Sequence, residues 1–281
     1  MFKKLIMGTI VLVFAASCLA NRPDLSQPIL DLNQDQQTIM SEVIPELKKN
    51  RIILVGEHHS KTAHHMAQLT VIQALYQSGA NVAIGLEMFR QDSQNALDRW
   101  IAGEMAENEF ERIYYDNWNF PYSAYRPIFE YAKEKKIPLV GLNLPRKITR
   151  QVSRRGFQSL SKEEKGKLSE VACRVDEAYM KYIRKAFGGH AHGNLNFTYF
   201  CEAQLVWDNA MAINTLDYLS TKPDAVVVVL TGTGHAQKAA IPRQIRSRSP
   251  MPYVVILPEV PGMLDAHTIG KEDADYLMLD L

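Results

Sequence analysis

The sequence predicts an α/β protein with a mostly parallel β-sheet flanked by helices, and with an inserted helical lid subdomain. Three observations lead to this fold class. Short, nearly continuous apolar runs recur along the chain, as is typical of strands that are covered on both faces. Helical patterns separate these runs, and this alternation favours a parallel sheet with right-handed crossovers. The chain has 281 residues, 46% of them hydrophobic, so it is long enough to bury a substantial core.

Five apolar runs are the expected strands: Ile52–Val55, Val82–Leu86, Pro138–Leu142, Ala225–Leu230 and Tyr253–Leu257. After the first run, Ser60 is placed to cap a helix that extends to about Ser78, where Gly79 stops it. This helix is expected to bury apolar residues at spacings of three or four, namely Met66, Leu69, Ile72 and either Leu75 or Tyr76.

The connection between the third and fourth strands is too long for a single crossover. Residues 146–221 are therefore expected to form the lid, inserted into an α/β core of residues 46–145 and 222–265. Within the lid, one helix is predicted from Lys162 to Phe187 and another from Phe197 to Ser220, with the stretch "GGHAHGN" as a loop between them. Residues 266–281 are left as a C-terminal tail.

The N-terminal residues have the composition of an export signal. Two lysines precede a short apolar stretch and then small residues, and the stretch is too short for a comfortable membrane span. The small residues before Cys18 are similar to a bacterial lipobox. Residues 1–17 are thus a predicted signal peptide and Cys18 a predicted lipidation site, with simple cleavage as the alternative. Leu19 favours the outer membrane, and residues 18–45 are a linker and N-terminal segment.

Charge and cysteine content exclude several classes of protein. The 32 basic and 31 acidic residues give a net charge of +1, which argues against a nucleic-acid binder. Beyond Cys18, the chain has only Cys173 and Cys201, without a CxxC or CxxCH motif, so neither a zinc knuckle nor covalently attached haem is indicated. An exported protein can form a disulfide between the two, but two buried free thiols remain the alternative.

Polar residues and glycines follow four of the expected strands where each strand ends: "GEHH" (56–59), "GLE" (85–87), "GLN" (141–143) and "TGTGH" (231–235). Because ligands bind beyond the carboxyl ends of parallel strands, these four stretches are expected to meet along one edge of the sheet. Two of them contain Gly-x-x-His, and neither matches a glycine-rich phosphate-binding signature.

This cluster of side chains allows three interpretations. His59, Glu87 and His235 are suitable ligands for a divalent transition metal. Together with Glu57, the same residues could instead serve as the general base, the orienting acid and the proton donor of an enzyme. In the third interpretation they form a hydrogen-bonded polar network with only a structural role.

Two further histidines lie in the first expected helix. His65 precedes Leu69 by four residues, so it belongs to the buried stripe and could join the site. His64 is expected to point away from it. A neutral imidazole is favoured here, because the helix N-terminus carries a partial positive charge.

An aromatic stretch, "YYDNWNFPYSAYRPIFEYAKEKKIP", runs from Tyr114 to Pro138. Core packing accounts for Phe129, but less well for Tyr122 and Tyr125. Tyrosine phenolate is a known axial ligand of ferric haem. Five basic side chains nearby could bind the haem propionates: Arg146, Lys147, Arg150, Arg154 and Arg155. Alternatively, these side chains only form the solvent-exposed face of a lid helix.

Six stretches of the chain, in order, carry a resemblance to a known family: "VGEHHS…HH" (55–65), "GLEMF" (85–89), "NWNFPYSAYRPIFEYA" (117–132), "GLNLPRK" (141–147), "EAQLVWDNAMA" (202–212) and "GTGHA" (232–236). With these motifs and its export signal, the chain resembles the ChaN family of iron-regulated haem-binding lipoproteins. That family lies within the Tiki/TraB/erythromycin-esterase-like superfamily.

The family resemblance implies a haem-binding lipoprotein of the bacterial envelope that acts in iron acquisition. Haem would occupy a cleft at the carboxyl ends of the strands, enclosed by a homodimer, with a tyrosine on each iron. Tyr125 is the first candidate ligand, and the other expected haem contacts are Tyr122, Tyr199, His58, His59, Arg146, Lys147 and His235. Further expected partners are the membrane, through the lipid anchor, and an outer-membrane haem receptor.

The superfamily implies a different function for the strand ends. Members with paired Gly-x-x-His motifs resemble metal-dependent hydrolases that act on peptides or esters. Gly56–His59 and Gly232–His235 match that pattern, and Glu57, His59, Glu87 and His235 would be the catalytic and metal-binding residues.

Overall fold

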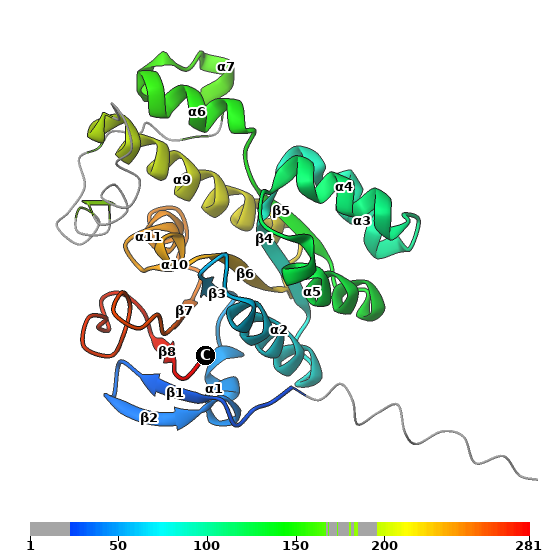
Figure 1. Cartoon of the computed structure of the whole chain (residues 1–281), viewed down its shortest axis with the longest axis vertical. Coiled ribbons are helices and arrows are strands. Elements are labelled where there is room, and N and C mark those ends of the chain that lie inside the picture. Colours follow the sequence, from blue (N-terminus) through cyan, green and yellow to red (C-terminus); the bar gives the residue numbers. More distant parts are fainter. Residues whose placement is uncertain (1–22, 167, 169–172, 174–179, 181–182, 185–195) are drawn as a thin grey trace, which may run out of the picture.

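An eight-stranded sheet runs through the centre of the molecule (Figure 1). The computed structural model describes residues 23–166, 168, 173, 180, 183–184 and 196–281. In chain order the strands are β1 (Pro28–Asp31), β2 (Gln36–Ile39), β3 (Ile52–Glu57), β4 (Val82–Arg90), β5 (Leu139–Asn143), β6 (Val226–Gly232), β7 (Tyr253–Pro258) and β8 (Tyr276–Met278). Their order across the sheet is β2-β1-β8-β7-β3-β6-β4-β5.

The predicted fold class is confirmed, and the five predicted strands form one continuous part of this sheet, with β5 at its edge. β7, β3, β6, β4 and β5 lie side by side and are all parallel. Only β1 pairs antiparallel, with β2 on one side and β8 on the other. The carboxyl ends of β3, β4, β5 and β6 therefore lie at one edge of the sheet. The four polar stretches that follow these strands were expected to meet there.

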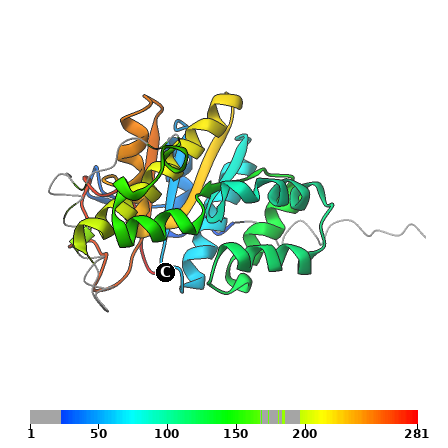
Figure 2. The same cartoon turned by 90° about the horizontal axis from the view of Figure 1, so that it is seen from above.

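Helices cover both faces of the sheet. They are α1 (Met40–Leu47), α2 (Thr62–Gln77), η1 (Gln91–Ser93), α3 (Gln94–Ala102), α4 (Glu107–Asn117), α5 (Tyr122–Lys135), α6 (Arg146–Arg155), η2 (Phe157–Ser159), α7 (Lys162–Lys165), α9 (Phe197–Thr221), α10 (Thr233–Ala236) and α11 (Ile241–Arg246). Seen from above, α3 to α5 lie at the opposite end of the molecule from α11 (Figure 2).

Each central strand contributes to two hydrophobic cores because successive side chains point to opposite faces. Ile53 and Val55 of β3 pack in the core on the side of α1 to α5. Ile52 and Leu54 pack in the core on the side of α9 and α11. Burial on both faces is the reason that these strands are continuous apolar runs without polar alternation.

The first helix after β3 differs from the prediction in three details. Ser60 lies outside α2, whose N-terminal flanking residue is Lys61, and the Ser60 hydroxyl contacts Nδ1 of His58 at 3.0 Å instead. Met66 is 44% exposed, whereas His64 is buried. His64 was expected to point away, but its Nδ1 accepts a hydrogen bond of 2.9 Å from the backbone N–H of His58, which turns the ring toward the strand end.

The structure places strands in both terminal segments. β1, β2 and most of α1 lie within residues 18–45, which the sequence suggested as a linker, and β8 lies within the expected C-terminal tail. These strands have only three or four residues each, and most side chains of β2 are exposed. Strands this short contain too few residues for a recognisable apolar pattern, so they could not be predicted.

The described part of the lid has a small hydrophobic core of its own. Ile148 and Val152 of α6 pack against Phe157 of η2 and against Phe200 and Val206 of α9. The predicted helix at 197–220 is present as α9. Of the predicted helix at 162–187, α7 is described, and most of the remainder lies outside the described residues, as does "GGHAHGN".

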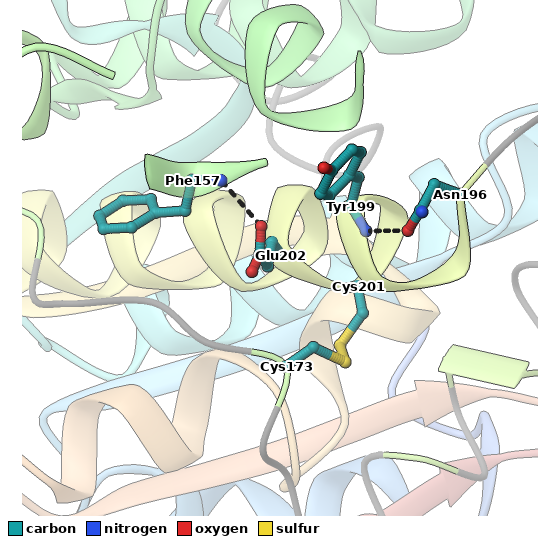
Figure 3. Close-up of a disulfide and its surroundings, with 6 residues drawn as sticks. All are labelled: Phe157, Cys173, Asn196, Tyr199, Cys201 and Glu202. Atoms are coloured by element: carbon teal, nitrogen blue, oxygen red, sulfur yellow. Dashed lines mark hydrogen bonds between the residues drawn. A yellow bond between two sulfur atoms is a disulfide. The ribbon is translucent and has the colours of Figure 1, made fainter. Parts of the chain in front are cut away.

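Cys173 and Cys201 form a disulfide, with their Cα atoms 5.7 Å apart (Figure 3). The sequence left open whether these cysteines pair. The bond attaches Cys173 to the first turns of α9. Across the described residues, no helix combines the length and apolarity that a membrane span needs.

Candidate functional site

Glu57 and His59 form the first half of the site, at the end of β3. Nδ1 of His59 lies 2.7 Å from Oε1 of Glu57, which is almost fully buried. The His59 side chain is 27% exposed, and its ring packs against Trp118 and Phe120, with centroids 5.1 and 4.9 Å away. The carboxylate therefore fixes the orientation of an imidazole that lies partly open to solvent.

Two buried side chains of α2 and α5 hold Glu57 in place. The Tyr125 hydroxyl donates to Oε1 at 2.5 Å, and Nε2 of His65 lies 3.0 Å from Oε2. The Tyr125 and His65 rings are tilted against each other, 4.1 Å apart. Burial alone would raise the pKa of Glu57, but the contacts from His59 and His65 outweigh it and lower the pKa to about 2. Glu57 is thus a buried carboxylate that stays ionised.

Glu87 of β4 lies on the other side of His59. Its Oε2 accepts hydrogen bonds from the Thr231 hydroxyl at 2.6 Å and from the Gly232 N–H at 2.7 Å, both at the end of β6. Gly232 leaves room for the His59 ring, because a Cβ atom at this position would lie only 3.0 Å from Cε1 of His59. Asn143, at the end of β5, donates to the Glu87 carbonyl at 2.9 Å. Residues from four strand ends therefore meet around Glu87.

His235 completes the cluster from the turn after β6. Its Nδ1 lies 2.6 Å from Oδ1 of Asp208 in α9, and its Nε2 lies 3.9 Å from Oε1 of Glu87. Asp208 is fully buried. Burial alone would lower the pKa of His235, but the charges of Asp208 and Glu87 raise it to about 9. His235 is therefore an imidazolium at neutral pH, held between two carboxylates.

The histidine–carboxylate centre, as we call Glu57, His59, Glu87, Asp208 and His235, contains two equivalent pairs. In each pair a carboxylate binds Nδ1 of a histidine, and Glu87 lies between them. Burial acts to lower the pKa of His59, but Glu57 and Glu87 raise it. Such a centre can donate and accept protons.

The expected metal site is not formed among the described residues. In that part of the chain, no group of three or more histidine, cysteine, aspartate or glutamate side chains is arranged to hold a metal ion. One oxygen of Glu87 is already bonded to Thr231 and Gly232, and the other is 3.9 Å from His235. His59, Glu87 and His235 are neighbours, but they do not converge on one point.

A groove between α6 and α9 opens beside this centre, with a cavity volume of about 470 Å³. Its aromatic lining consists of Trp118, Phe120, Phe200 and Trp207. Trp118 and Phe120 also pack on His59, and the Trp207 ring lies 5.9 Å from His235. The groove, which we call the α6–α9 groove, is therefore separated from the centre by a layer of aromatic rings.

The same groove has two arginines on its α6 side, Arg146 and Arg150, both exposed. Arg146 donates to the Asn117 carbonyl at 2.8 Å and to Oδ1 of Asn119 at 3.1 Å, so the loop before α5 orients it. Neither arginine forms an ion pair with a described carboxylate within 4.0 Å. The groove thus offers flat apolar walls and two unneutralised cations, which suits a flat, apolar anion.

Comparison with known families gives a match over most of the chain. The model of the family described as haem-binding uptake, Tiki superfamily, ChaN covers residues 43–245. The chain belongs to this family. A comparison with curated proteins finds no match.

Solved structures share the fold of this family member. One is ChaN of Campylobacter jejuni, described as showing cofacial heme binding, with 22% identity, a TM-score of 0.71, and coverage of 89% of this chain and 95% of that chain. An open form of a mutant erythromycin esterase, EreC, has 16% identity and a TM-score of 0.50, with coverage of 80% and 77%. A succinoglycan biosynthesis protein has 11% identity and a TM-score of 0.50, with coverage of 78% and 68%.

The three tyrosines expected to contact haem lie in different places. Tyr125 is fully buried and bonded to Glu57, and Tyr122 is buried among Phe110, Tyr114 and Phe129. Burial raises the pKa of both phenols, which disfavours the phenolate needed for iron. As described, neither hydroxyl reaches the groove. Tyr199 is half-buried in the first turn of α9, next to Phe200 of the groove wall.

Tyr199 is positioned by the start of α9 (Figure 3). Oδ1 of Asn196 accepts the Tyr199 backbone N–H at 3.1 Å and so caps the helix. Its ring packs against Gly156, where φ is +79° and where a Cβ atom would lie 2.8 Å from the ring. Tyr199 therefore lies against Gly156 and is not part of the described groove lining, although its neighbour Phe200 is.

The remaining expected haem contacts divide between the groove and other surfaces. Arg146 lines the α6–α9 groove, whereas Lys147 points to a separate groove between α6 and α7. His58 is exposed, and its Nδ1 contacts Ser60. His59 and His235 belong to the histidine–carboxylate centre rather than to the groove lining.

Sequence reasoning did not assign Asp208, Trp118 or Trp207 to the site, whereas Thr231 lies in a stretch that was expected there. The motif "EAQLVWDNAMA" contains both Trp207 and Asp208. An aspartate within an apolar helical segment is a signal that could have been used, because a buried carboxylate needs a partner. No sequence signal indicated that this partner is His235.

Proposed function

We propose that this protein binds haem in the α6–α9 groove. The observation that carries the proposal is the combination, in one groove, of four aromatic side chains and two exposed arginines that have no carboxylate partner among the described residues. Haem is a flat aromatic macrocycle with two propionates. Its faces suit Trp118, Phe120, Phe200 and Trp207, and Arg146 and Arg150 suit its carboxylates, since guanidinium and carboxylate groups form strong charge-assisted hydrogen bonds.

Tyr199 is the residue that we propose as the iron ligand. It is half-exposed and adjoins the groove-lining Phe200 in sequence, whereas Tyr122 and Tyr125 are buried in the core. Replacing Tyr199 with Phe should change the absorption spectrum of bound ferric haem, because a phenolate ligand gives a characteristic high-spin ferric spectrum. An unchanged spectrum in the variant would exclude Tyr199 as the ligand.

The biological setting that we propose is haem or iron acquisition at the bacterial envelope. The family description, haem-binding uptake, supports this setting. The export signal and the lipobox-like residues before Cys18 support an outer-membrane lipoprotein. Cofacial haem binding by the Campylobacter jejuni protein supports a homodimer in which two grooves face each other. A haem receptor of the outer membrane would then be the partner.

A hemin titration of the purified protein tests the groove. Wild-type protein should give a saturable shift of the Soret band. The double variant Arg146→Gln/Arg150→Gln should bind hemin about 10- to 100-fold more weakly, because each lost contact to a charged group costs about 1.5–3 kcal/mol, with partial compensation between the two. Lys147→Gln is the matched control, since Lys147 is on the same helix but lines a different groove.

Two results would contradict the proposal that haem binds in the α6–α9 groove. Loss of affinity in Lys147→Gln equal to that in the double variant would show that only the net charge of α6 matters. Unchanged binding by Arg146→Gln/Arg150→Gln would show that haem binds elsewhere. Size-exclusion chromatography with light scattering, with and without hemin, tests the dimer.

A second candidate function is acid–base hydrolysis of an ester or peptide. The observation in its favour is the histidine–carboxylate centre, in which Glu57 and Asp208 each orient a histidine toward Glu87. We propose no metal for this reaction. Hydrolysis of aryl esters should be insensitive to chelators and should fall at least 100-fold in His59→Gln and in His235→Gln. No measurable hydrolysis by the wild-type protein would remove this candidate.

A further inference from the structure

The lining of the α6–α9 groove contains stacking surfaces and cations, but no strong ligand for ferric iron among the described residues. Besides the four aromatic side chains and two arginines, this lining consists of Asn119, Thr149, Ser153, Ala203 and Gln204. Ferric haem proteins use histidine, cysteine, methionine or tyrosine as axial ligands. None of these residue types belongs to the described lining, so this part of the groove offers a porphyrin its faces and its carboxylates to bind, and not its metal.

The nearest ligand-type side chains are engaged elsewhere. Nδ1 of His59 is held by Glu57, and its ring edge faces Gly232 behind Trp118 and Phe120. Nδ1 of His235 is held by Asp208, and its ring lies behind Trp207.

Tyr199 lies outside the groove lining, on the neighbouring face of α9. Iron coordination by Tyr199 would therefore be added to a site that aromatic rings and arginines already form.

We infer that the groove recognises a porphyrin mainly by its macrocycle and its two carboxylates, with iron coordination as an addition, so that it also binds metal-free dicarboxylic porphyrins. This inference rests on the proposed function, because it concerns the same groove. It extends the ligand class from haem to the porphyrin dicarboxylates in general.

Two kinds of interaction with a porphyrin remain when it carries no metal, one apolar and one polar. Burying an aromatic macrocycle between tryptophan and phenylalanine rings contributes the hydrophobic part of the affinity, which is the same for haem and for the metal-free ring. The arginines contribute the polar part, and Arg146 is already oriented by Asn117 and Asn119. A site oriented before binding loses less entropy when the ligand binds.

Three probes separate these contributions: hemin, protoporphyrin IX and protoporphyrin IX dimethyl ester. Each is titrated into the purified full-length protein in a detergent concentration that keeps the porphyrins monomeric. Quenching of tryptophan fluorescence reports all three, because Trp118 and Trp207 line the groove. We expect protoporphyrin IX to bind within about threefold of hemin, and the dimethyl ester at least tenfold more weakly.

The protein variants test whether the arginines act on the carboxylates. Arg146→Gln/Arg150→Gln should weaken hemin and protoporphyrin IX by the same factor and leave the weak binding of the dimethyl ester unchanged. Lys147→Gln should behave like wild type with all three probes. Equal tryptophan quenching by the three porphyrins would reveal unspecific hydrophobic adsorption and would overturn the inference.

The remaining outcomes distinguish this inference from the proposed function. Saturable hemin binding with protoporphyrin IX at least 30-fold weaker would show that iron ligation carries the affinity. That result overturns the inference and leaves haem binding intact. Absence of saturable binding by both hemin and protoporphyrin IX would overturn the proposed function itself.

Discussion

The histidine–carboxylate centre and the α6–α9 groove are neighbours with opposite electrostatic character. In the centre every histidine faces a carboxylate, and Glu57, Asp208 and Glu87 are all buried. In the groove the charged groups are two exposed arginines without a described carboxylate partner. The aromatic layer of Trp118, Phe120 and Trp207 divides the two regions.

This difference in charge compensation indicates which of the two regions is better suited to bind a ligand. The centre satisfies its own charges, so a further anion or cation gains little there and would have to displace an internal contact. The groove leaves cations and apolar rings exposed, so an aromatic anion gains from both. A strand-end cluster rich in titratable residues can thus be a self-contained structure, while the ligand site that we propose lies beside it, between the inserted lid and the loop before α5.

Substitution of Asp208 is expected to have the largest effect on stability. Asp208→Asn leaves the His235 imidazolium buried without its partner, and breaking such a buried pair costs about 3–5 kcal/mol. The free energy of unfolding from urea denaturation measures this loss. Asp224→Asn, an exposed acid just after α9, is the control and should change stability by less than about 0.5 kcal/mol.

If the centre and the groove are separate regions, the affinity of folded Asp208→Asn protein for hemin should stay within a few-fold of the wild-type affinity. A parallel loss of hemin affinity and stability would show that the centre and the groove are one site.

The pH dependence of stability should also trace to the centre. The pKa of His235 is about 9 in the folded protein, above the value of 6.5 of the free side chain. Its contribution is therefore fully present below pH 6.5 and is lost as the pH rises to about 9, with a slope of at most about 1.4 kcal/mol per pH unit. Urea denaturation at pH 6, 7.5 and 9 should show this decline in wild type and a flatter profile in His235→Gln.

Two buried tyrosines give the smallest and most selective test. Tyr125→Phe removes the hydroxyl that donates to Glu57 and should cost about 1–2 kcal/mol. Tyr122→Phe is the matched control, because its buried hydroxyl has no hydrogen-bond partner among the described residues, and its loss should be neutral or stabilising. Both stabilities can be measured by urea denaturation.

Hemin binding by these two variants decides whether Tyr125 supports Glu57 in the core or coordinates the haem iron. Both should retain wild-type hemin spectra if Tyr125 belongs to the centre. A changed ferric spectrum in Tyr125→Phe alone would restore Tyr125 as the iron ligand that the sequence suggested.

The central strands could be predicted because burial on both faces leaves a strong apolar signal at residues such as Ile53 and Leu54. The meeting of strand ends followed from the parallel topology, so Glu57, Glu87 and His235 could be expected at one edge. β1, β2 and β8 could not be predicted in the same way, because strands of three or four residues give too little pattern.

The details within the site depend on tertiary packing, which a single sequence does not contain. Tyr125 looked like a ligand because its pattern within α5 was ambiguous, but the packing of α5 on α2 places its hydroxyl on Glu57. Lys147 and Arg146 are adjacent in sequence, yet they line different grooves because successive helical residues point about 100° apart. The partnership of Asp208 with His235 joins the lid helix to the sheet across 27 residues.

The helix α9 carries residues of the disulfide, of the α6–α9 groove and of the histidine–carboxylate centre. α9 has 25 residues and so spans about 37 Å. Cys201, near its start, is joined to Cys173, while Phe200 and Trp207 line the groove and Asp208 holds His235. Because a helix moves largely as a rigid body, a ligand that displaces Phe200 would tilt the same element that orients His235. The disulfide at the start of α9 would therefore limit how far both the groove wall and the carboxylate partner of His235 can shift.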